Sequence, residues 1–178
     1  MISATEIDTG RLRLRALTPE DLGDLCSIYG DPDVARGFMT RKPKSEGETL
    51  AVLTRDIERF DKRGVGVWGV VYKPDEKLIG RAAPQYLDQT PEVEVSFILA
   101  RPYWGEGLAT EAAEALLSYG FEEAGLARIV GVAHVDHVAS HRVMEKAGVK
   151  YEREGRFYGS DMKYYSVSRE EYEKNRPL

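Results

Sequence analysis

Two glycines stand directly before a segment with strong helical patterning. Gly105 and Gly107 flank Glu106, and from Leu108 onward apolar residues recur at helical spacing. A helix N-terminus presents unpaired N–H groups and the positive end of the helix dipole, so it attracts anions. Thr110 adds a hydroxyl in the first turn. The segment predicts a phosphate-binding turn, although its spacing alone is equally typical of a plain glycine-rich turn.

Neither standard nucleotide motif is present at this turn. A dinucleotide-binding G-x-G-x-x-G would need glycine at position 110, where Thr110 stands, and a P-loop would need G-K-[ST]. A glycine-bearing anion site of another kind is therefore the hypothesis to pursue.

All three histidines fall in one short segment. His137 and His141 are four residues apart and could share a helix face, a geometry that can chelate zinc. A structural zinc site needs four defined ligands, and this pair has no glutamate in the metalloprotease arrangement. We expect no metal here, and ordinary hydrogen bonding is the alternative for His134, His137 and His141.

The elements that position these residues follow from periodicity and turn residues. Asp136 can cap a helix, Gly148 suits the end of that helix, and residues 30–44 are expected to be irregular. The predicted helices span residues 18–29, 45–63, 108–125 and 136–146. The predicted strands span residues 11–15, 65–72, 78–86, 91–99, 128–133, 150–157 and 162–168. This order predicts one α+β domain over residues 1–178.

The segment from Trp104 to Ala112 resembles the acyl-CoA pyrophosphate loop of the GCN5-related N-acetyltransferase (GNAT) superfamily. The superfamily pattern Q/R-x-x-G-x-G/A maps onto Trp104, Gly107 and Ala109, with tryptophan in the first position. The branch that acetylates ribosomal-protein N-termini is the most similar one. The resemblance extends from about residue 11 to residue 168 and includes residues 11–15, 18–21, 79–80 and 139–148.

The resemblance implies a single GNAT-like α+β domain, with a mixed, mostly antiparallel sheet of about seven strands flanked by helices and a splayed fourth and fifth strand pair. It implies acetyl-CoA as co-substrate and direct transfer of acetyl to a primary amine in a ternary complex. The amine could belong to a protein N-terminus, a polyamine, an aminoglycoside or another small molecule. By position, the pantetheine contacts fall to Phe97, Ile98 and Leu99. The pyrophosphate contacts fall to Trp104, Gly105, Glu106, Gly107, Leu108, Ala109 and Thr110.

The same resemblance suggests catalytic candidates. Glu94 is the candidate for taking the amine proton through water, because the resemblance implies this role for a carboxylate at this strand position; the alternative is an exposed strand residue like Glu92. Ser140 matches a serine near the thioester sulfur that helps to protonate the thiolate, or it bonds to the backbone. Tyr158 and Tyr164 are weaker candidates for that proton.

Two histidines occupy positions where relatives usually carry asparagine. His137 could replace the amide toward CoA or the amine, and His134 could act as base in place of Glu94. Arg142 is placed near the CoA phosphates. Because of these departures, a catalytically degenerate acyl-CoA-binding sensor or partner module is the alternative function.

The composition narrows the class of protein further. The chain has 178 residues and a net charge of -5, which argues against a general nucleic-acid binder. No apolar stretch reaches the ~20 residues of a membrane helix, and charges interrupt any signal peptide, so we expect a cytoplasmic protein with no membrane partner. Cys26, the only cysteine, falls on an apolar helical stripe and is expected in the core. Whether the chain forms a homodimer is left open.

Overall fold

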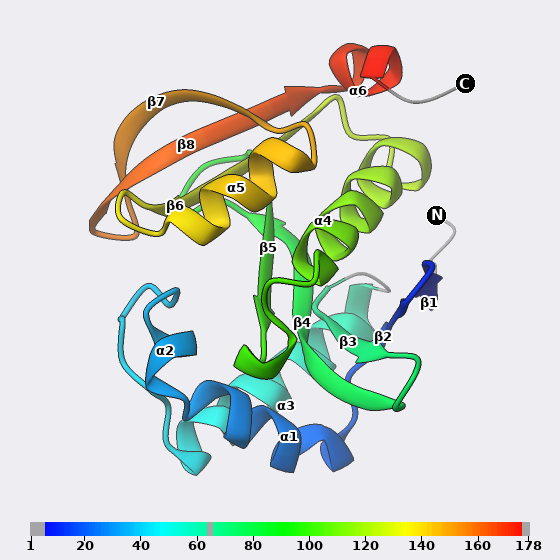
Figure 1. Ribbon diagram of the computed structural model, residues 1–178, viewed down its shortest axis with the longest axis vertical. Helices are drawn as coiled ribbons and strands as arrows, with labels where there is room; N and C mark the ends of the chain where they lie inside the picture. Colours follow the sequence, from blue (N-terminus) through cyan, green and yellow to red (C-terminus); the bar gives the residue numbers. More distant parts are fainter. Residues whose placement is uncertain (1–5, 64–65, 176–178) are drawn as a thin grey trace.

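The computed structural model describes residues 6–63 and 66–175, which form one mixed sheet covered by helices (Figure 1). The sheet order is β1-β2-β3-β4-β5-β6-β8-β7, and only β5 and β6 pair in parallel. The strands are β1 (Glu6–Asp8), β2 (Leu12–Ala16), β3 (Trp68–Tyr72), β4 (Lys77–Tyr86), β5 (Val93–Leu99), β6 (Arg128–His134), β7 (Lys150–Phe157) and β8 (Ser160–Ser168). The expected α+β class with a mostly antiparallel sheet is confirmed.

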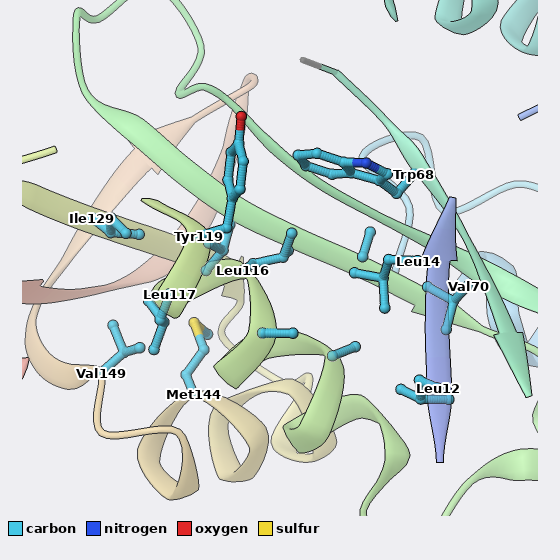
Figure 2. Packing of buried hydrophobic residues seen from close by; sticks show 14 of the residues in the cluster. Leu12, Leu14, Trp68, Val70, Leu116, Leu117, Tyr119, Ile129, Met144 and Val149 are labelled. Atoms are coloured by element: carbon cyan, nitrogen blue, oxygen red, sulfur yellow. The ribbon is translucent and has the colours of Figure 1, made fainter. Parts of the chain in front are cut away.

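Helices cover both faces of this sheet. The helices are α1 (Leu22–Tyr29), α2 (Pro32–Ala35), α3 (Glu46–Arg63), α4 (Leu108–Ser118), α5 (Val138–Lys146) and α6 (Arg169–Asn175). Apolar side chains of α1, α2 and α3 pack in one buried cluster, and those of α4 and α5 pack in another, which Phe60 of α3 also joins. In Figure 2, Leu116 of α4 lies on the side of Leu14 of β2, and Leu117 lies on the side of Met144 of α5.

Sequence periodicity located every predicted strand and helix within a few residues, and it missed three short elements. These are β1, α2 and α6. The prediction that residues 30–44 are irregular is wrong at α2, where the Asp31 carboxylate accepts the Asp33 N–H at 2.8 Å and Pro32 opens the helix. The predicted start of a strand at Val65 lies outside the described residues, and β3 begins at Trp68.

The prediction that Asp136 caps the helix of residues 136–146 is also wrong. His137 occupies the N-cap position of α5 and makes no side-chain cap. The Asp136 carboxylate instead pairs with Arg41, at 2.6 Å, which lowers the pKa of Asp136 to about 2. A tertiary ion pair across 95 residues therefore ties the segment after α2 to the start of α5.

The one parallel strand pair separates soon after it forms. Glu94 of β5 registers with Val130 of β6, and this is the single register pair between the two strands. On its other side β5 stays paired with β4 along its whole length. Gly80 permits that close approach, because a Cβ at this position would collide with the carbonyl oxygen of Ile98. The expected splayed strand pair is β5 and β6.

Candidate active site

A cleft of about 500 Å³ opens where β5 and β6 separate. Its wall is built from β4, β5, the glycine turn before α4, the first turns of α5 and the segment around α2. Such a site, at the diverging ends of two parallel strands and beside a helix N-terminus, is a common position for a ligand in mixed α/β sheets.

The glycine turn has the conformation that its residues predict. Gly105 and Gly107 have φ of +80° and +78°, in the left-handed region that favours glycine. Gly107 is the N-cap of α4, so the N–H groups of the first helical turn have no partner within the helix. Among the residues predicted to bind the pyrophosphate, six line the cleft: Trp104, Gly105, Gly107, Leu108, Ala109 and Thr110. Glu106 is exposed and is not part of the lining.

Residues from the start of the chain brace this turn. The Arg11 guanidinium donates to the Glu106 carbonyl at 2.9 Å and to the Glu111 carboxylate at 2.8 Å. Glu111, in the first turn of α4, also accepts the Thr9 hydroxyl at 2.6 Å. These contacts anchor the middle of the glycine turn and the first turn of α4 to the segment that leads into β2.

The backbone of β5 faces the cleft after the strands part. Ala100 donates its N–H to Ile79 of β4 at 2.7 Å, and hydrogen-bonding direction alternates along an antiparallel strand. Phe97 and Leu99 therefore direct their N–H and C=O groups toward the space from which β6 has diverged. The Leu99 carbonyl accepts the indole N–H of Trp104 at 2.8 Å. Phe97 is thus the residue best placed to pair with an extended pantetheine arm.

Glu94 is a buried carboxylate that lines the cleft. It is only 3% exposed, so the alternative that it is a solvent-facing strand residue does not hold. Its Oε1 accepts the Tyr158 hydroxyl at 2.6 Å and the Gln85 side-chain amide at 2.6 Å. Burial raises the pKa of Glu94, and the bonds from Tyr158 and Gln85 partly oppose that rise. A carboxyl group with a raised pKa is a stronger base than an ordinary glutamate.

The three histidines have separate surroundings. His134 is 3% exposed and does not line the cleft, and its Nε2 lies 3.0 Å from the Phe38 carbonyl, an acceptor that requires a proton on that nitrogen. His141 is buried and stacks on Tyr165. His137 lines the cleft, and burial, followed by the neighbouring His141 and His134, lowers its pKa and favours the neutral ring.

Several other predicted residues also reach the cleft. Ser140 and Arg142 of α5 line it, as do Phe97, Ile98 and Leu99 of β5. Tyr158 and Tyr164 do not, and their hydroxyls donate to Glu94 and Glu92, each at 2.6 Å. Cys26 is half-buried, so the expectation that it packs in the core is wrong, and it lies outside the lining.

The sequence reasoning missed one polar wall of the cleft. Arg81 and Gln85 lie on β4 opposite Ile98 and Glu94 of β5. The period of two along residues 77–86 places Arg81 and Gln85 on one face, which was the available signal. The sequence pattern did not predict that Gln85 and Tyr158 donate hydrogen bonds to Glu94.

The arrangement fits an acyl-CoA. Unpaired N–H groups at α4, the cations Arg142 and Lys146 on α5 and the diverging edge of β5 face the same cleft. The N–H groups and the cations are complementary to the phosphates of such a ligand, and the edge of β5 is complementary to its pantetheine arm.

Comparison with known proteins agrees with this geometry. The family model described as an acetyltransferase (GNAT) domain matches residues 11–150. YkkB of Bacillus subtilis (strain 168), described as uncharacterized, is 30% identical over 173 residues, covering 93% of this chain and 96% of YkkB. A GNAT-family acetyltransferase from Bacillus anthracis has a TM-score of 0.81 at 24% identity, covering 93% of this chain and 99% of that one. RimL, a ribosomal L7/L12 alpha-N-protein acetyltransferase solved with coenzyme A, has a TM-score of 0.76 at 16% identity, covering 92% and 97%.

The chain belongs to the GNAT acetyltransferase family. Its reaction class is therefore acyl transfer, and the family uses acetyl-CoA as the acyl donor. In the described part of the chain, no helix is long and apolar enough to cross a membrane. Within the same residues, no group of three or more histidine, cysteine, aspartate or glutamate side chains could hold a metal ion.

Proposed function

We propose that this protein transfers acetyl from acetyl-CoA directly to a primary amine, with both substrates bound together. The observation that carries the proposal is one cleft that contains both the glycine turn at α4 and the buried Glu94. Donor and acceptor can thus meet beside a base without a covalent enzyme intermediate. The position of Cys26 outside the cleft lining agrees with direct transfer.

The proposed acetyl-CoA site uses two backbone features, the N–H groups at the start of α4 and the edge of β5 that faces the cleft. The N–H groups at the start of α4 hold the diphosphate, while Arg142 and Lys146 lie beside it on α5. The pantetheine arm pairs with β5 at Phe97. This places the thioester near the point at which β5 and β6 separate, beside Glu94 and Val130.

Glu94 is proposed as the proton acceptor for the amine. Both of its hydrogen bonds go to Oε1, and in the described residues no bond to Oε2 occurs, so Oε2 is the oxygen for the amine or a bridging water. The amine nitrogen attacks the thioester carbon, the C–N bond forms, the C–S bond breaks, and Glu94 takes the amine proton. Ser140 is proposed to donate a proton to the leaving thiolate and to regain one from solvent as it does so. His134 is a weaker base candidate because its Nε2 is engaged with Phe38.

Steady-state kinetics test this function. Acetyl-CoA is incubated with a panel of amines, thiol release is followed by absorbance, and the acetylated product is identified by mass spectrometry. Intersecting initial-velocity lines are expected for a ternary complex, whereas parallel lines would indicate an acyl-enzyme. Tight binding of CoA with no transfer to any amine would contradict the proposal and favour an acyl-CoA-binding sensor.

A further inference from the structure

One face of the β4–β5 pair lines the cleft with polar groups. Arg81 registers with Ile98, and Gln85 registers with Glu94. Because side chains alternate between the faces of a sheet, these residues share one face, together with Ser96. All five line the cleft. Glu94 lies at one end of this wall, and Arg81 lies opposite Ile98, four residues away, about 14 Å along the strand at ~3.4 Å per residue.

Arg81 is held in place by a buried carboxylate. Its Nη1 lies 3.2 Å from Oδ2 of Asp56, which is 1% exposed on α3. The Arg81 side chain is 19% exposed, and its guanidinium lies 5.7 Å from the ring centroid of Tyr29. A guanidinium carries five N–H donors. In the described residues only Nη1 is engaged, so further donors of Arg81 are available to a ligand in the cleft.

Two more groups meet Arg81 at this end of the cleft. The Tyr29 hydroxyl is buried and has no hydrogen-bond partner among the described residues, although Tyr29 lines the cleft. The Tyr29 ring packs edge-on against Phe38, with 5.5 Å between centroids, and Nζ of Lys44 lies 5.1 Å above the Phe38 ring. Lys44 also lines the cleft. Tyr29, Lys44 and Arg81 form what we call the cationic corner.

We propose that the cationic corner binds a carboxylate of the acceptor, so that the substrate is a primary amine carrying a carboxylate several bonds from its nitrogen. This inference rests on the proposed function. The separation along β5 places the amine near Glu94 and the carboxylate near Arg81. Asp56 neutralises part of the charge of Arg81, while Lys44 adds a second cation. An elongated amino acid or a short acidic peptide fits this pattern, and a polyamine or aminoglycoside would bring further positive charges against Lys44 and Arg81.

Matched pairs of small amines test the inference. We compare kcat/KM for 6-aminohexanoate and 6-aminohexanamide, which differ only in the charge of the far end, and we include spermidine as a polycation. The wild-type enzyme is expected to prefer the acid by 10-fold or more, through a lower KM. Equal use of acid and amide, or preference for spermidine, would overturn the inference while leaving acetyl transfer established. Failure to acetylate any amine would instead contradict the proposed function, and this inference with it.

Variants of the cationic corner test whether its residues cause the preference for the acid over the amide. Lys44→Gln and Tyr29→Phe should each lower the acid-to-amide ratio several-fold. Arg81→Gln is combined with Asp56→Asn, so that the buried Asp56 carboxylate is not left with Arg55, at 3.4 Å, as its remaining cation, and should bring the ratio close to one. Lys42→Gln is the matched control, because Lys42 lies in the same segment, is exposed and does not line the cleft. A ratio that survives all three changes in variants with a normal circular-dichroism spectrum would overturn the proposal.

Discussion

Glu94 is a carboxylate buried at the rim of a strand separation and held by two donors from different parts of the chain. Gln85 comes from β4, nine residues away, and Tyr158 comes from the turn between β7 and β8, 64 residues away. Tyr158 is itself fixed by Asp88, whose N–H donates to the Tyr158 hydroxyl at 2.9 Å and whose carboxylate accepts the Tyr158 N–H at 2.9 Å. These hydrogen bonds hold Oε1 of Glu94 between two donors.

Glu94→Gln should lower kcat by about 100-fold or more, the usual size of a general-base contribution. In the wild-type enzyme the rate should fall as the pH drops through a pKa above the ordinary 4.5, because the carboxylate must be ionised to accept a proton. The variant should lose this acid limb. Rates measured from pH 5 to 9 check it, and wild-type rates in the variant would remove Glu94 from the mechanism.

Glu94→Gln also tests how the charge of Glu94 affects the stability of the fold. A carboxyl whose pKa is raised in the folded state binds its proton more tightly there, so its contribution to stability declines as the pH rises through that pKa. Glutamine cannot ionise, and its amide oxygen can still accept from Tyr158 and Gln85. At pH 8 Glu94→Gln should therefore unfold in denaturant at no lower concentration than the wild type. A clear loss of stability would show that the charge of Glu94 supports the fold.

Tyr158→Phe tests the positioning role of the hydrogen bond from Tyr158. The Tyr158 hydrogen bond lowers the pKa of Glu94, so its removal should move the acid limb of the pH–rate profile to higher pH. We also expect kcat to fall several-fold. Tyr164→Phe is the control, because its hydroxyl donates to Glu92 rather than to Glu94. Equal profiles for the two variants would contradict a specific role for Tyr158.

At the scale of elements, the glycine turn depends on a segment almost a hundred residues before it. Arg11 bonds to Glu106 within the turn and to Glu111 in the first turn of α4. The turn is therefore fixed by tertiary contacts as well as by its two left-handed glycines.

Arg11→Ala should raise KM for acetyl-CoA about five-fold, equivalent to about 1 kcal/mol for a lost hydrogen-bond brace, with a smaller effect on kcat. Arg13→Ala is the matched control, since Arg13 lies two residues further along, in β2, and pairs with Asp8 and Glu76. Titration of acetyl-CoA at saturating amine measures the difference. The same KM for acetyl-CoA in both variants would show that the contacts of Arg11 with Glu106 and Glu111 do not affect acetyl-CoA binding.

At the scale of the whole molecule, two buried clusters on opposite faces hold the sheet in place. Leu116 of α4 is fully buried in the cluster that also contains Leu14 of β2 and Met144 of α5 (Figure 2). Because α4 carries the glycine turn and α5 carries His137, Ser140 and Arg142, this packing sets the spacing of the donor side of the cleft.

Leu116→Ala should lower the free energy of unfolding by about 2–5 kcal/mol, because it removes buried methyl groups and leaves a cavity. Leu50→Ala should change stability by less than about 0.5 kcal/mol, since Leu50 is 48% exposed on α3. Urea unfolding followed by circular dichroism measures both. A loss at Leu116 no larger than at Leu50 would contradict the assignment of this core.

The sequence by itself determined most of the elements and the glycine turn. Alternating residues marked the strands, the helical stripe from Leu108 marked α4, and Gly105 and Gly107 marked a backbone that only glycine adopts readily. These features are local, because each depends on residues a few positions apart. β1, α2 and α6 are too short to show a repeating hydrophobic pattern, so the sequence did not predict them.

Only the tertiary structure decided which polar residues meet. Glu94 and Glu92 have the same kind of sequence neighbourhood, yet Glu94 lies under Gln85 and Tyr158 while Glu92 pairs with Tyr164. By sequence His134 is an alternative base to Glu94, whereas in the fold its Nε2 is engaged by the carbonyl of Phe38, 96 residues away. Burial and hydrogen bonding between distant segments depend on strand register and on the point at which β5 leaves β6. Those are properties of the assembled sheet, and no stretch of sequence contains them.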